Sequence, residues 1–450
     1  MLIKFSVENF KTFNDLSELS LIQSAKITEN KNHVSNVKDV NLLKYASIYG
    51  ANSAGKSSLI DAILFFKNTV IQGLSPATRN MYCRLKKENR NKPSSFELQF
   101  SFGNKIYAYG FSALLYEQKI QSEWLYELLT KGKSKAIFEY DLNNDIDIKQ
   151  VRNYGISDNE VNRFKVYAND FKKYDKYLFL TEMNRNKIID GKSKMSVFNK
   201  VFFYIFNNIV ALKPDTGMIS NNWFSDKTYN SINNIMKSLD TGISEIEFRK
   251  ISLEELSNRL PLEVYNNLRI SINEALTEPQ RMMGNITMNN GELIISTVKD
   301  NTYKIYLVKN KHKNSEDEFD FEEESDGTKR IFWLLNLLIN EAEDMVYFVD
   351  EIDRSLHPKL TEKFIKLFDE YHSNSKIQLI LTTHESSIMN LDLFRRDEIW
   401  FIDKGEDNNS KLYSLDSFKE RYDKKIEKAY LEGRYGAIPV FEEFNLSEED

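Results

Sequence analysis

The feature that most constrains the fold is a glycine-rich loop between an apolar strand and an amphipathic helix. Residues 50–57 read GANSAGKS, which fits the spacing G-x-x-x-x-G-K-[ST]. The preceding KYASIY predicts a short buried strand, and the following SLIDAILFFKNTV has the apolar periodicity of a helix. Strand, loop and helix in this order predict a phosphate-binding loop, because glycines let backbone N–H groups ring a phosphate at the helix N-terminus. The alternative is a glycine-rich turn that only caps a helix.

Two side chains of this loop carry the expected chemistry. Lys56 would reach the β- and γ-phosphates of a nucleotide, and the hydroxyl of Ser57 would ligate Mg²⁺. Such a site also needs an acidic strand end, which residues 345–358 (MVYFVDEIDRSLHP) supply. Their apolar run predicts a buried parallel strand that ends in Asp350 and Glu351. Asp350 would hold Mg²⁺ through water, and Glu351 would polarise the attacking water; the alternative is an ordinary acidic loop.

A helix and a second apolar strand follow this acidic pair. Residues 358–372 have the pattern of a helix, and KIQLILTTHES predicts a strand that ends at Thr382, Thr383 and His384. A βαβ unit brings the carboxyl ends of its two strands to one edge of a sheet, so His384 should lie beside Glu351. A lone histidine is more often structural, but this position favours a sensor of the γ-phosphate.

A capped helix is predicted just before the acidic strand. In EESDGTKRIFWLLNLL, residues 323–338, Ser325 can cap a helix that starts near Gly327 and is buried through its leucines. Glycine lets another backbone approach closely, and a helix N-terminus attracts anions, so this is a second candidate phosphate site. The alternative is an ordinary well-capped helix.

With all four pieces in order, the chain resembles ABC-type ATPase heads of the SMC, RecF and overcoming-lysogenization-defect group. Residues 50–57 match the Walker A motif of that group, residues 325–328 its signature motif, residues 346–351 its Walker B motif and His384 its switch histidine. The opening IKFSVENFKTF resembles the first two strands of the group and the turn that lies near the nucleotide.

The resemblance implies both a fold and a set of site residues. The fold is α/β: an ABC-type P-loop NTPase head, with a mixed sheet and flanking helices, that binds ATP and Mg²⁺ and hydrolyses ATP. The implied residues are Glu351 and His384 for catalysis, Ser57 and Asp350 for the metal, and Lys11, Asn52, Ala54, Gly55, Lys56, Ser57, Ser58, Ser325 and Gly327 for the nucleotide.

The closing KKIEKAYLEGRYGAIP, residues 424–439, narrows the resemblance. Together with SDGT and DEIDRSLHP, it is similar to stand-alone AAA ATPases of bacterial abortive-infection and antiphage operons, AbiL-like proteins among them. The segment itself could be a docking element or a packed C-terminal latch. The Q-loop glutamine of the group also stays open between Gln99 and Gln118. No long heptad-bearing arm is visible, and the 66 residues after His384 show no second metal-carboxylate cluster, so neither an SMC-style coiled coil nor a fused nuclease is expected.

Residue patterns divide the chain into three expected parts. These are the N-terminal part of the ATPase head at 1–115, an inserted, mainly helical lobe at 116–290, and the C-terminal part of the head at 291–450. Hairpin turns are expected at Gly103-Asn104 and near Asp300-Asn301, where alternating apolar patterns reverse. The acidic stretch 316–326 predicts a solvated loop, or else a segment that repels phosphate until a partner rearranges it.

Composition limits the compartment and the partners. The 450-residue chain has a net charge of -6 and one cysteine, Cys83, so no internal disulfide can form and a reducing cytoplasm is expected. The start lacks the apolar core of a signal peptide, and the apolar helical run at 331–339 is too short to span a bilayer, so no membrane partner is expected. The acidic balance argues against attraction of nucleic acid to the whole surface, but it leaves a local basic patch open.

The leading functional hypothesis is an ATP-driven switch of a bacterial antiphage, abortive-infection system. Two chains would sandwich two nucleotides, as a homodimer or within a higher oligomer. The switch would control an operon-encoded effector, expected to be a nuclease, in response to a phage-encoded trigger. One alternative is a RecF-like DNA-repair ATPase acting on DNA, which the acidic balance and the missing arms disfavour. Another is a nucleotide-binding scaffold without turnover, which Glu351 disfavours because a pure binder needs no base there.

Overall fold

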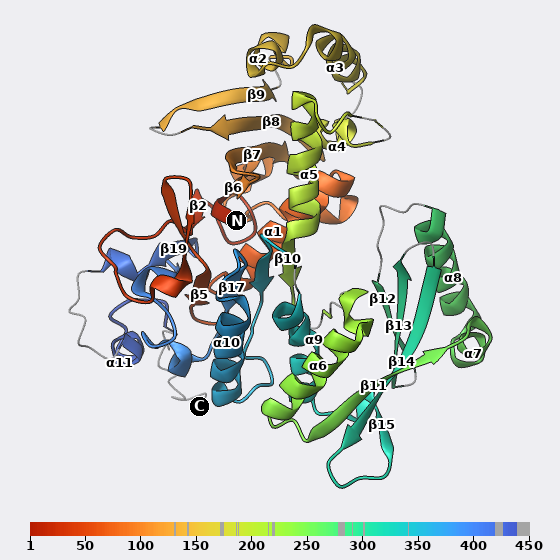
Figure 1. The fold of residues 1–450 in the computed structure, drawn as a ribbon. Helices are drawn as coiled ribbons and strands as arrows, with labels where there is room; N and C mark the ends of the chain where they lie inside the picture. The colour runs from red at the N-terminus through yellow and green to blue at the C-terminus, as the bar shows by residue number, and fades with distance from the viewer. Residues whose placement is uncertain are drawn as a thin grey trace, which may run out of the picture. The chain divides into compact units, whose positions relative to one another are not determined.

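The computed structural model divides the chain into two compact units. Unit 1 comprises Met1–Lys213, Glu343–Ile352 and Ser373–Asp450, and unit 2 comprises Pro214–Ala342 and Asp353–His372 (Figure 1). The described residues are 1–129, 132–141, 144–171, 175–185, 187, 189–214, 216–217, 221–277, 284–289, 291–299, 302–340, 342–418 and 426–438. Both units combine helices with sheets, so the expected α/β fold class is confirmed.

A mixed, mainly parallel sheet forms one half of unit 1. Its strand order is β10-β16-β17-β5-β18-β19, and only the last pair, β18 with β19, is antiparallel. The strands β5, β16 and β17 are buried along their whole length, as their uninterrupted apolar runs predict. The bounds are β5 (Tyr45–Tyr49), β10 (Ile209–Leu212), β16 (Val346–Val349), β17 (Gln378–Thr382), β18 (Ile399–Lys404) and β19 (Ser410–Ser414).

An antiparallel sheet with the order β2-β1-β6-β7-β8-β9 forms the other half of unit 1. Buried and more exposed residues alternate along β6, because one face of this sheet packs on the core. The hairpin expected at Gly103-Asn104 is confirmed, since Phe102 pairs with Lys105. The bounds are β1 (Leu2–Glu8), β2 (Ser17–Ser20), β6 (Ser94–Phe102), β7 (Lys105–Leu114), β8 (Lys119–Leu128) and β9 (Ser134–Asp141); β3 (Val34–Val37) and β4 (Val40–Leu43) form a separate small hairpin.

The helix α1 (Lys56–Gln72) joins the two sheets through one cluster of buried side chains. On the antiparallel side, the ring of Phe65 lies 4.8 Å from that of Phe96, and Phe66 stacks on Phe111 at 5.6 Å. Residues of β5 and β16 belong to the same cluster. The helix that begins at Lys56 is therefore held on both sides. The other helices of unit 1 are α2 (Ile148–Tyr154), α3 (Asp158–Phe171), α4 (Phe179–Met183), α5 (Val197–Asn208) and α11 (Ile426–Leu431).

Unit 2 contains a second antiparallel sheet, ordered β11-β14-β13-β12, with β15 paired to β14. The expected hairpin is present, because Lys299 of β13 pairs with Thr302 of β14; its turn, Asp300 and Asn301, lies outside the described residues. The strands are β11 (Ile243–Ile251), β12 (Gly284–Asn289), β13 (Glu292–Lys299), β14 (Thr302–His312) and β15 (Glu318–Asp320). The helices are α6 (Asp226–Ser238), α7 (Leu253–Arg259), α8 (Leu262–Thr277), α9 (Asp326–Ile339) and α10 (Pro358–His372).

The boundaries between units differ from the expected 116–290 insert. Strands β8 and β9 extend the antiparallel sheet beyond residue 116, and β10 lies beside β16 in the mixed sheet, so the chain leaves unit 1 only after Lys213. Strands β8 and β9 continue the local hairpins that start at β7, whereas β10 pairs with a strand more than a hundred residues later in the chain, a contact that local periodicity does not report. The acidic stretch 316–326 also differs from a purely solvated loop, because it forms β15 and Glu324 is buried with its Oε1 atom 2.9 Å from Nε2 of His312.

No helix among the described residues has both the length and the hydropathy needed to cross a bilayer.

Candidate nucleotide-binding site

The glycine-rich loop connects β5 to α1 in unit 1, as the sequence predicts. Gly55 caps the helix with φ at 124°, a conformation that L side chains rarely adopt. A Cβ atom there would also lie 2.8 Å from Oγ1 of Thr12 and would collide with the hydroxyl of Ser410. Ser410 itself donates a hydrogen bond to the carbonyl of Ala54. The start of β19 therefore supports the loop from outside, a contact that no motif in the sequence signals.

Lys56 is the first residue of α1, and it is buried. Its Nζ atom donates to the carbonyl oxygens of Gly50 at 2.6 Å and Ala51 at 3.1 Å, and it lies 3.4 Å from Nδ1 of His384. An ammonium has no lone pair, so this contact suits a His384 tautomer that accepts at Nδ1 and carries its proton on Nε2. Lys56 thus reaches back over the loop, which places its charge where a phosphate in the loop would lie.

The acidic pair follows β16 directly. Oγ1 of Thr382, at the end of β17, donates to Oδ1 of Asp350 at 2.6 Å and accepts the backbone N–H of Glu351 at 2.9 Å. One hydroxyl therefore fixes both the carboxylate of one residue and the backbone of the next. Glu351 has φ at 46°, a left-handed conformation that is unusual for a residue with a long side chain.

The parallel pairing of β16 with β17 brings His384 to the acidic pair, as the βαβ argument predicts. Nε2 of His384 lies 3.8 Å from Oε1 of Glu351, so the imidazole stands between this carboxylate and Lys56. Both side chains stay about a third exposed, at 37% for His384 and 33% for Glu351. They can therefore meet a ligand that arrives from solvent.

The other residues predicted for the nucleotide site differ in their exposure to solvent. Ala54 is buried in the loop, Ser58 is half-buried, and Asn52 and Ser57 are exposed. Hydroxyl and carboxylate oxygens are the ligands that Mg²⁺ prefers, so Ser57 and Asp350 suit that ion in their chemistry.

Lys11 makes an ion pair that the sequence does not predict. Its ammonium contacts Oδ2 of Asp61 on α1, and Lys213 contacts Oδ1 of the same carboxylate at 2.5 Å. Partial burial favours the neutral acid, but the two lysines outweigh it and lower the pKa of Asp61. Asp61 and Lys213 could not be singled out, because nothing in either local pattern marks them as partners.

The predicted signature residues belong to unit 2. Ser325 caps α9, since its Oγ atom accepts the N–H of Thr328 at 3.2 Å. A Cβ atom on Gly327 would lie 2.7 Å from the carbonyl oxygen of Ser355, so the close approach of that turn requires glycine. The predicted cap is confirmed, and the helix presents a well-formed N-terminus.

The described part of the closing segment, residues 426–438, packs on β18 and β19. The rings of Tyr430 and Tyr435 stack on Phe401 at 5.6 and 5.5 Å, and Tyr413 donates to the carbonyl of Tyr435 at 2.7 Å. Tyr430 also lies 6.3 Å from Tyr49, the residue before the glycine-rich loop. Of the two interpretations, these residues fit the packed latch.

The two Q-loop candidates lie on the antiparallel side of unit 1. Gln99 of β6 donates to Glu97 at 2.8 Å, and Gln118, in the turn before β8, donates to the carbonyl of Leu115 at 2.8 Å. Neither hydrogen bond involves the glycine-rich loop, so the choice between them stays open.

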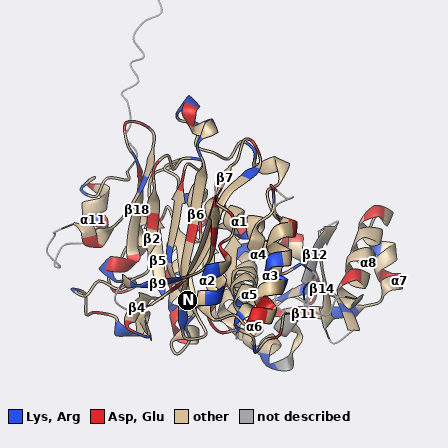
Figure 2. Ribbon diagram, turned by 90° about the horizontal axis from the view of Figure 1, so that it is seen from above, with Lys and Arg blue, Asp and Glu red and all other residues tan. Residues whose placement is uncertain are grey.

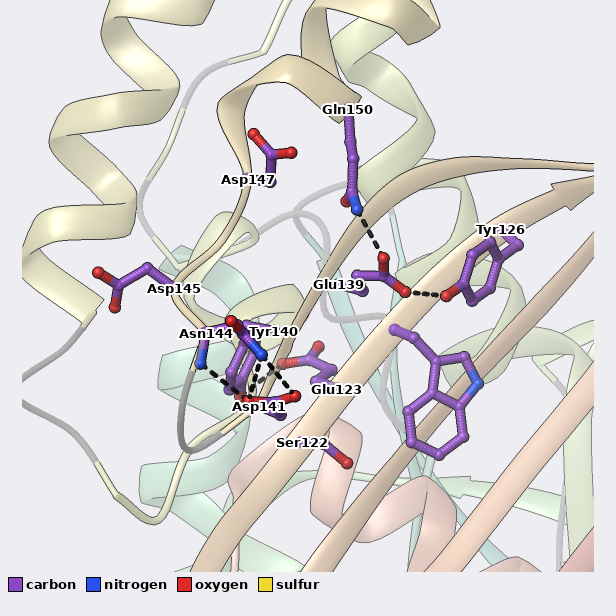
Figure 3. Close-up of a pocket in the computed structure, with 11 residues that line it drawn as sticks. Ser122, Glu123, Tyr126, Glu139, Tyr140, Asp141, Asn144, Asp145, Asp147 and Gln150 are labelled. Atoms are coloured by element: carbon purple, nitrogen blue, oxygen red, sulfur yellow. Dashed lines mark hydrogen bonds between the residues drawn. The ribbon is translucent and has the colours of Figure 1, made fainter.

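A separate polar cavity of about 530 Å³ lies beside β8, β9 and α2 (Figure 3). Glu123 is fully buried at its wall, where its carboxyl oxygens accept from the hydroxyls of Tyr109 and Tyr140 and from the N–H groups of Phe179 and Leu180. Burial raises the pKa of Glu123 to about 7 although four donors oppose it. This carboxyl ties α4 to the sheet.

Comparison with known proteins agrees with this geometry. Residues 46–390 match the model of the family described as "AAA domain, putative AbiEii toxin, Type IV TA system". The chain belongs to this AAA-domain family. The matched stretch runs from β5 past His384 and so contains the glycine-rich loop, the acidic pair and the histidine. Searched against curated proteins, the chain has no match.

Several solved structures are similar to this member of the family. The Smc head bound to the C-winged helix domain of ScpA is 15% identical, with a TM-score of 0.41 over 92% of this chain and 97% of that chain. The SMC head domain from Thermotoga maritima is 15% identical, with a TM-score of 0.32 over 92% and 98%. The Smc head with an extended coiled coil, bound to the C-terminal domain of ScpA derived from Pyrococcus furiosus, is 15% identical, with a TM-score of 0.38 over 96% and 98%.

Proposed function

We propose that this protein is an Mg²⁺-dependent ATPase that works as a molecular switch. The observation that carries the proposal is the meeting of Lys56, His384 and Glu351 at the carboxyl edge of the mixed sheet. A phosphate-binding lysine, a neutral imidazole and a carboxylate in this order suit a bound triphosphate that is attacked by water. Membership of an AAA-domain family supports the same activity.

Each residue then has a role in hydrolysis. The backbone N–H groups of the loop and Lys56 would hold the β- and γ-phosphates, and Ser57 and Asp350 would hold Mg²⁺, which neutralises charge on the phosphates. Glu351 would orient the attacking water and accept its proton. His384 would donate from Nε2 to the γ-phosphate, so that the imidazole senses whether that phosphate is present. Asn52, Ala54, Gly55 and Ser58 would complete the nucleotide contacts, and Lys11 would join them by leaving Asp61.

Glu351→Gln is the decisive variant. The amide keeps the size of the side chain but cannot accept the proton, so ATP should still bind while turnover falls by at least about a hundredfold. Phosphate release and ATP affinity measured on the same preparation separate the two effects. Near-normal hydrolysis in this variant would reject Glu351 as the base, and hydrolysis absent from the wild type would reject the ATPase itself.

The switch is proposed to be a homodimer or higher oligomer that closes on ATP. Ser325 and Gly327 would contact the nucleotide of the partner chain, because a capped helix N-terminus attracts a phosphate. Ser325→Arg should leave nucleotide binding to one chain intact but block ATP-dependent assembly and hydrolysis. Light scattering of Glu351→Gln with ATP, with and without Ser325→Arg, measures the assembly. Assembly in the double variant would contradict a role for this helix in the interface.

The biological role we propose is the control of an effector in antiphage defence, in the cytoplasm. The resemblance to abortive-infection ATPases supports this role, and the family description names a toxin of a toxin–antitoxin system. The effector is proposed to be a nuclease encoded beside this chain and activated by a phage-encoded trigger. Expression alone and with the neighbouring gene during infection, followed by cleavage assays on each purified protein, tests it. Nuclease activity of this chain alone would overturn the proposal.

A further inference from the structure

Residues 79–92 form a strongly basic segment in an otherwise acidic chain. They contain six Lys and Arg residues against one acidic residue, Glu88, whereas the whole chain carries a net charge of -6. In the ribbon, Lys and Arg positions are interspersed with Asp and Glu positions (Figure 2). The six basic side chains are all exposed, and they are Arg79, Arg84, Lys86, Lys87, Arg90 and Lys92. We call this segment the basic loop.

The cations of the basic loop have no acidic partners within the part of the chain that the structure describes. Among the residues that the structure describes, none of the six forms an ion pair with an aspartate or a glutamate. Elsewhere in unit 1 the lysines near the nucleotide site do form such pairs, as Lys11 and Lys213 do with Asp61. The positive potential of the basic loop therefore extends into solvent, where it can attract an anionic partner.

Two of its guanidinium groups are fixed on an aromatic ring. The Cζ atom of Arg79 lies 4.3 Å and that of Arg90 lies 3.4 Å from the ring centre of Tyr116. Arg79 also donates from Nε to the carbonyl of Tyr116 at 2.8 Å. Stacking on a ring restricts the guanidinium but leaves N–H groups at its edge to bind another group. The half-buried Tyr82 packs edge-on against Tyr116 at 6.4 Å.

The backbone of the basic loop is also held in place. The side-chain amide of Asn9 donates to the carbonyls of Asn89 at 3.0 Å and Lys92 at 2.9 Å, and its oxygen accepts the N–H of Cys83 at 3.2 Å. Lys11 donates its backbone N–H to the carbonyl of Met81 at 2.8 Å. Because the cations sit on a fixed backbone, little conformational entropy is lost when they bind a partner.

We propose that the basic loop binds the phosphate backbone of a nucleic acid. Six exposed cations within fourteen residues match the regular negative charge of such a backbone, and arginine forms bidentate contacts with phosphate. Tyrosine next to arginine is typical of surfaces that bind nucleic acid strands. A membrane surface is disfavoured, because Leu85, 42% exposed, is the one large apolar side chain of the described loop that is exposed.

Charge reversal tests the proposal on the full-length protein. The variant Arg84→Glu, Lys86→Glu, Lys87→Glu leaves the Tyr116 stack and the Asn9 hydrogen bonds in place. Its matched control, Lys149→Glu, Lys359→Glu, Lys363→Glu, changes the net charge equally at exposed lysines outside the loop. Fluorescence anisotropy with a labelled 20-base-pair DNA duplex and a 20-nucleotide RNA strand is measured across a salt series.

We expect the loop variant to bind at least about tenfold more weakly at low salt, with a salt slope smaller by about three, and the control to bind as the wild type does. If both variants bound nucleic acid equally more weakly, net charge alone would explain the effect, and the proposal would be overturned. The proposal would also be overturned if neither nucleic acid bound the wild type in a salt-dependent way. Polyglutamate that bound the loop more tightly than the nucleic acids would overturn it too. Thermal melts and ATP turnover of the loop variant should match the wild type, which shows that the fold and the nucleotide site are intact.

Discussion

Two glutamates of unit 1 show how position within a sheet decides what a carboxyl group can do. Glu351 follows the end of a parallel strand, stays partly exposed and faces His384. Glu123 lies within an antiparallel strand, is fully buried and is surrounded by four hydrogen-bond donors. The first is placed to meet a ligand, and the second holds neighbouring elements together. In this chain the edge of the parallel sheet thus leaves Glu351 open to a ligand, whereas the interior of the antiparallel sheet encloses Glu123.

Lys56→Ala should have the largest effect at the edge of the parallel sheet. The loop would lose its cation while the dipoles of its N–H groups remain, so ATP binding should become undetectable by calorimetry. The matched control is Lys4→Ala on the antiparallel sheet, where Lys4 forms an exposed pair with Glu18 and should be dispensable for binding. Unchanged affinity in Lys56→Ala would mean that the loop is not the nucleotide site.

Glu123→Gln tests the role of the buried carboxyl in the antiparallel sheet. Because burial raises the pKa of Glu123 to about 7, the folded protein keeps a proton that the unfolded chain loses above its ordinary value of 4.5. The free energy of unfolding should therefore fall between pH 4.5 and pH 7, by about 3 kcal/mol from this group. Urea unfolding at several pH values should show that the Gln variant lacks this part of the slope, and Ser122→Ala should keep it. Parallel pH curves for wild type and Gln variant would refute the assignment.

Thr382→Val probes how the edge carboxylates are held. The change keeps the shape of the side chain but removes both hydrogen bonds, to Asp350 and to the N–H of Glu351, so stability should fall by about 2 kcal/mol and turnover with it. Thr361→Val is the control, because Oγ1 of Thr361 is buried with no hydrogen-bond partner among the described residues. Thr361→Val should leave stability unchanged or slightly raise it. An equal loss of stability in both variants would show that Thr382 has no special role.

Asp61→Asn should have the smallest effect and the opposite pH dependence to that of Glu123. The pKa of Asp61 is lowered in the folded protein, so its ion pairs stabilise the fold above the ordinary Asp value and this contribution is lost as the pH falls through the folded-state pKa. At pH 7 the variant should be less stable by about 1 kcal/mol, and the difference should vanish once the pH falls below the lowered pKa of Asp61. A difference that grows on acidification would contradict the sign.

The sequence predicts the parts of the site that depend on one element or on elements that follow one another directly in the chain. The run before Gly50 and the run before Asp350 are each apolar throughout, so they predict buried parallel strands, and the βαβ spacing predicts that His384 meets Glu351. The N-cap at Ser325 is equally predictable from the sequence, because its hydrogen bond joins two residues within four positions of the chain.

The remaining contacts join residues that are far apart in the chain. Ser410 supports Ala54 across more than three hundred residues, and β10 pairs with β16 although only Asn207 and Asn208 separate its four apolar residues from the apolar part of α5. Lys213 meets Asp61 only because β10 returns the chain to α1. Such contacts depend on the order of strands in the sheet, and residue periodicity carries no information on that order.

At Glu351 the left-handed backbone conformation lowers the stability of the fold, although this residue is the one proposed to act in hydrolysis. A glutamate at φ 46° costs more free energy than glycine or asparagine would there, so the native residue is not the most stable choice. A variant library selected only for heat resistance should therefore enrich glycine or asparagine at position 351 and lose turnover. The native Glu351 thus provides a carboxylate at a position where glycine or asparagine would be more stable.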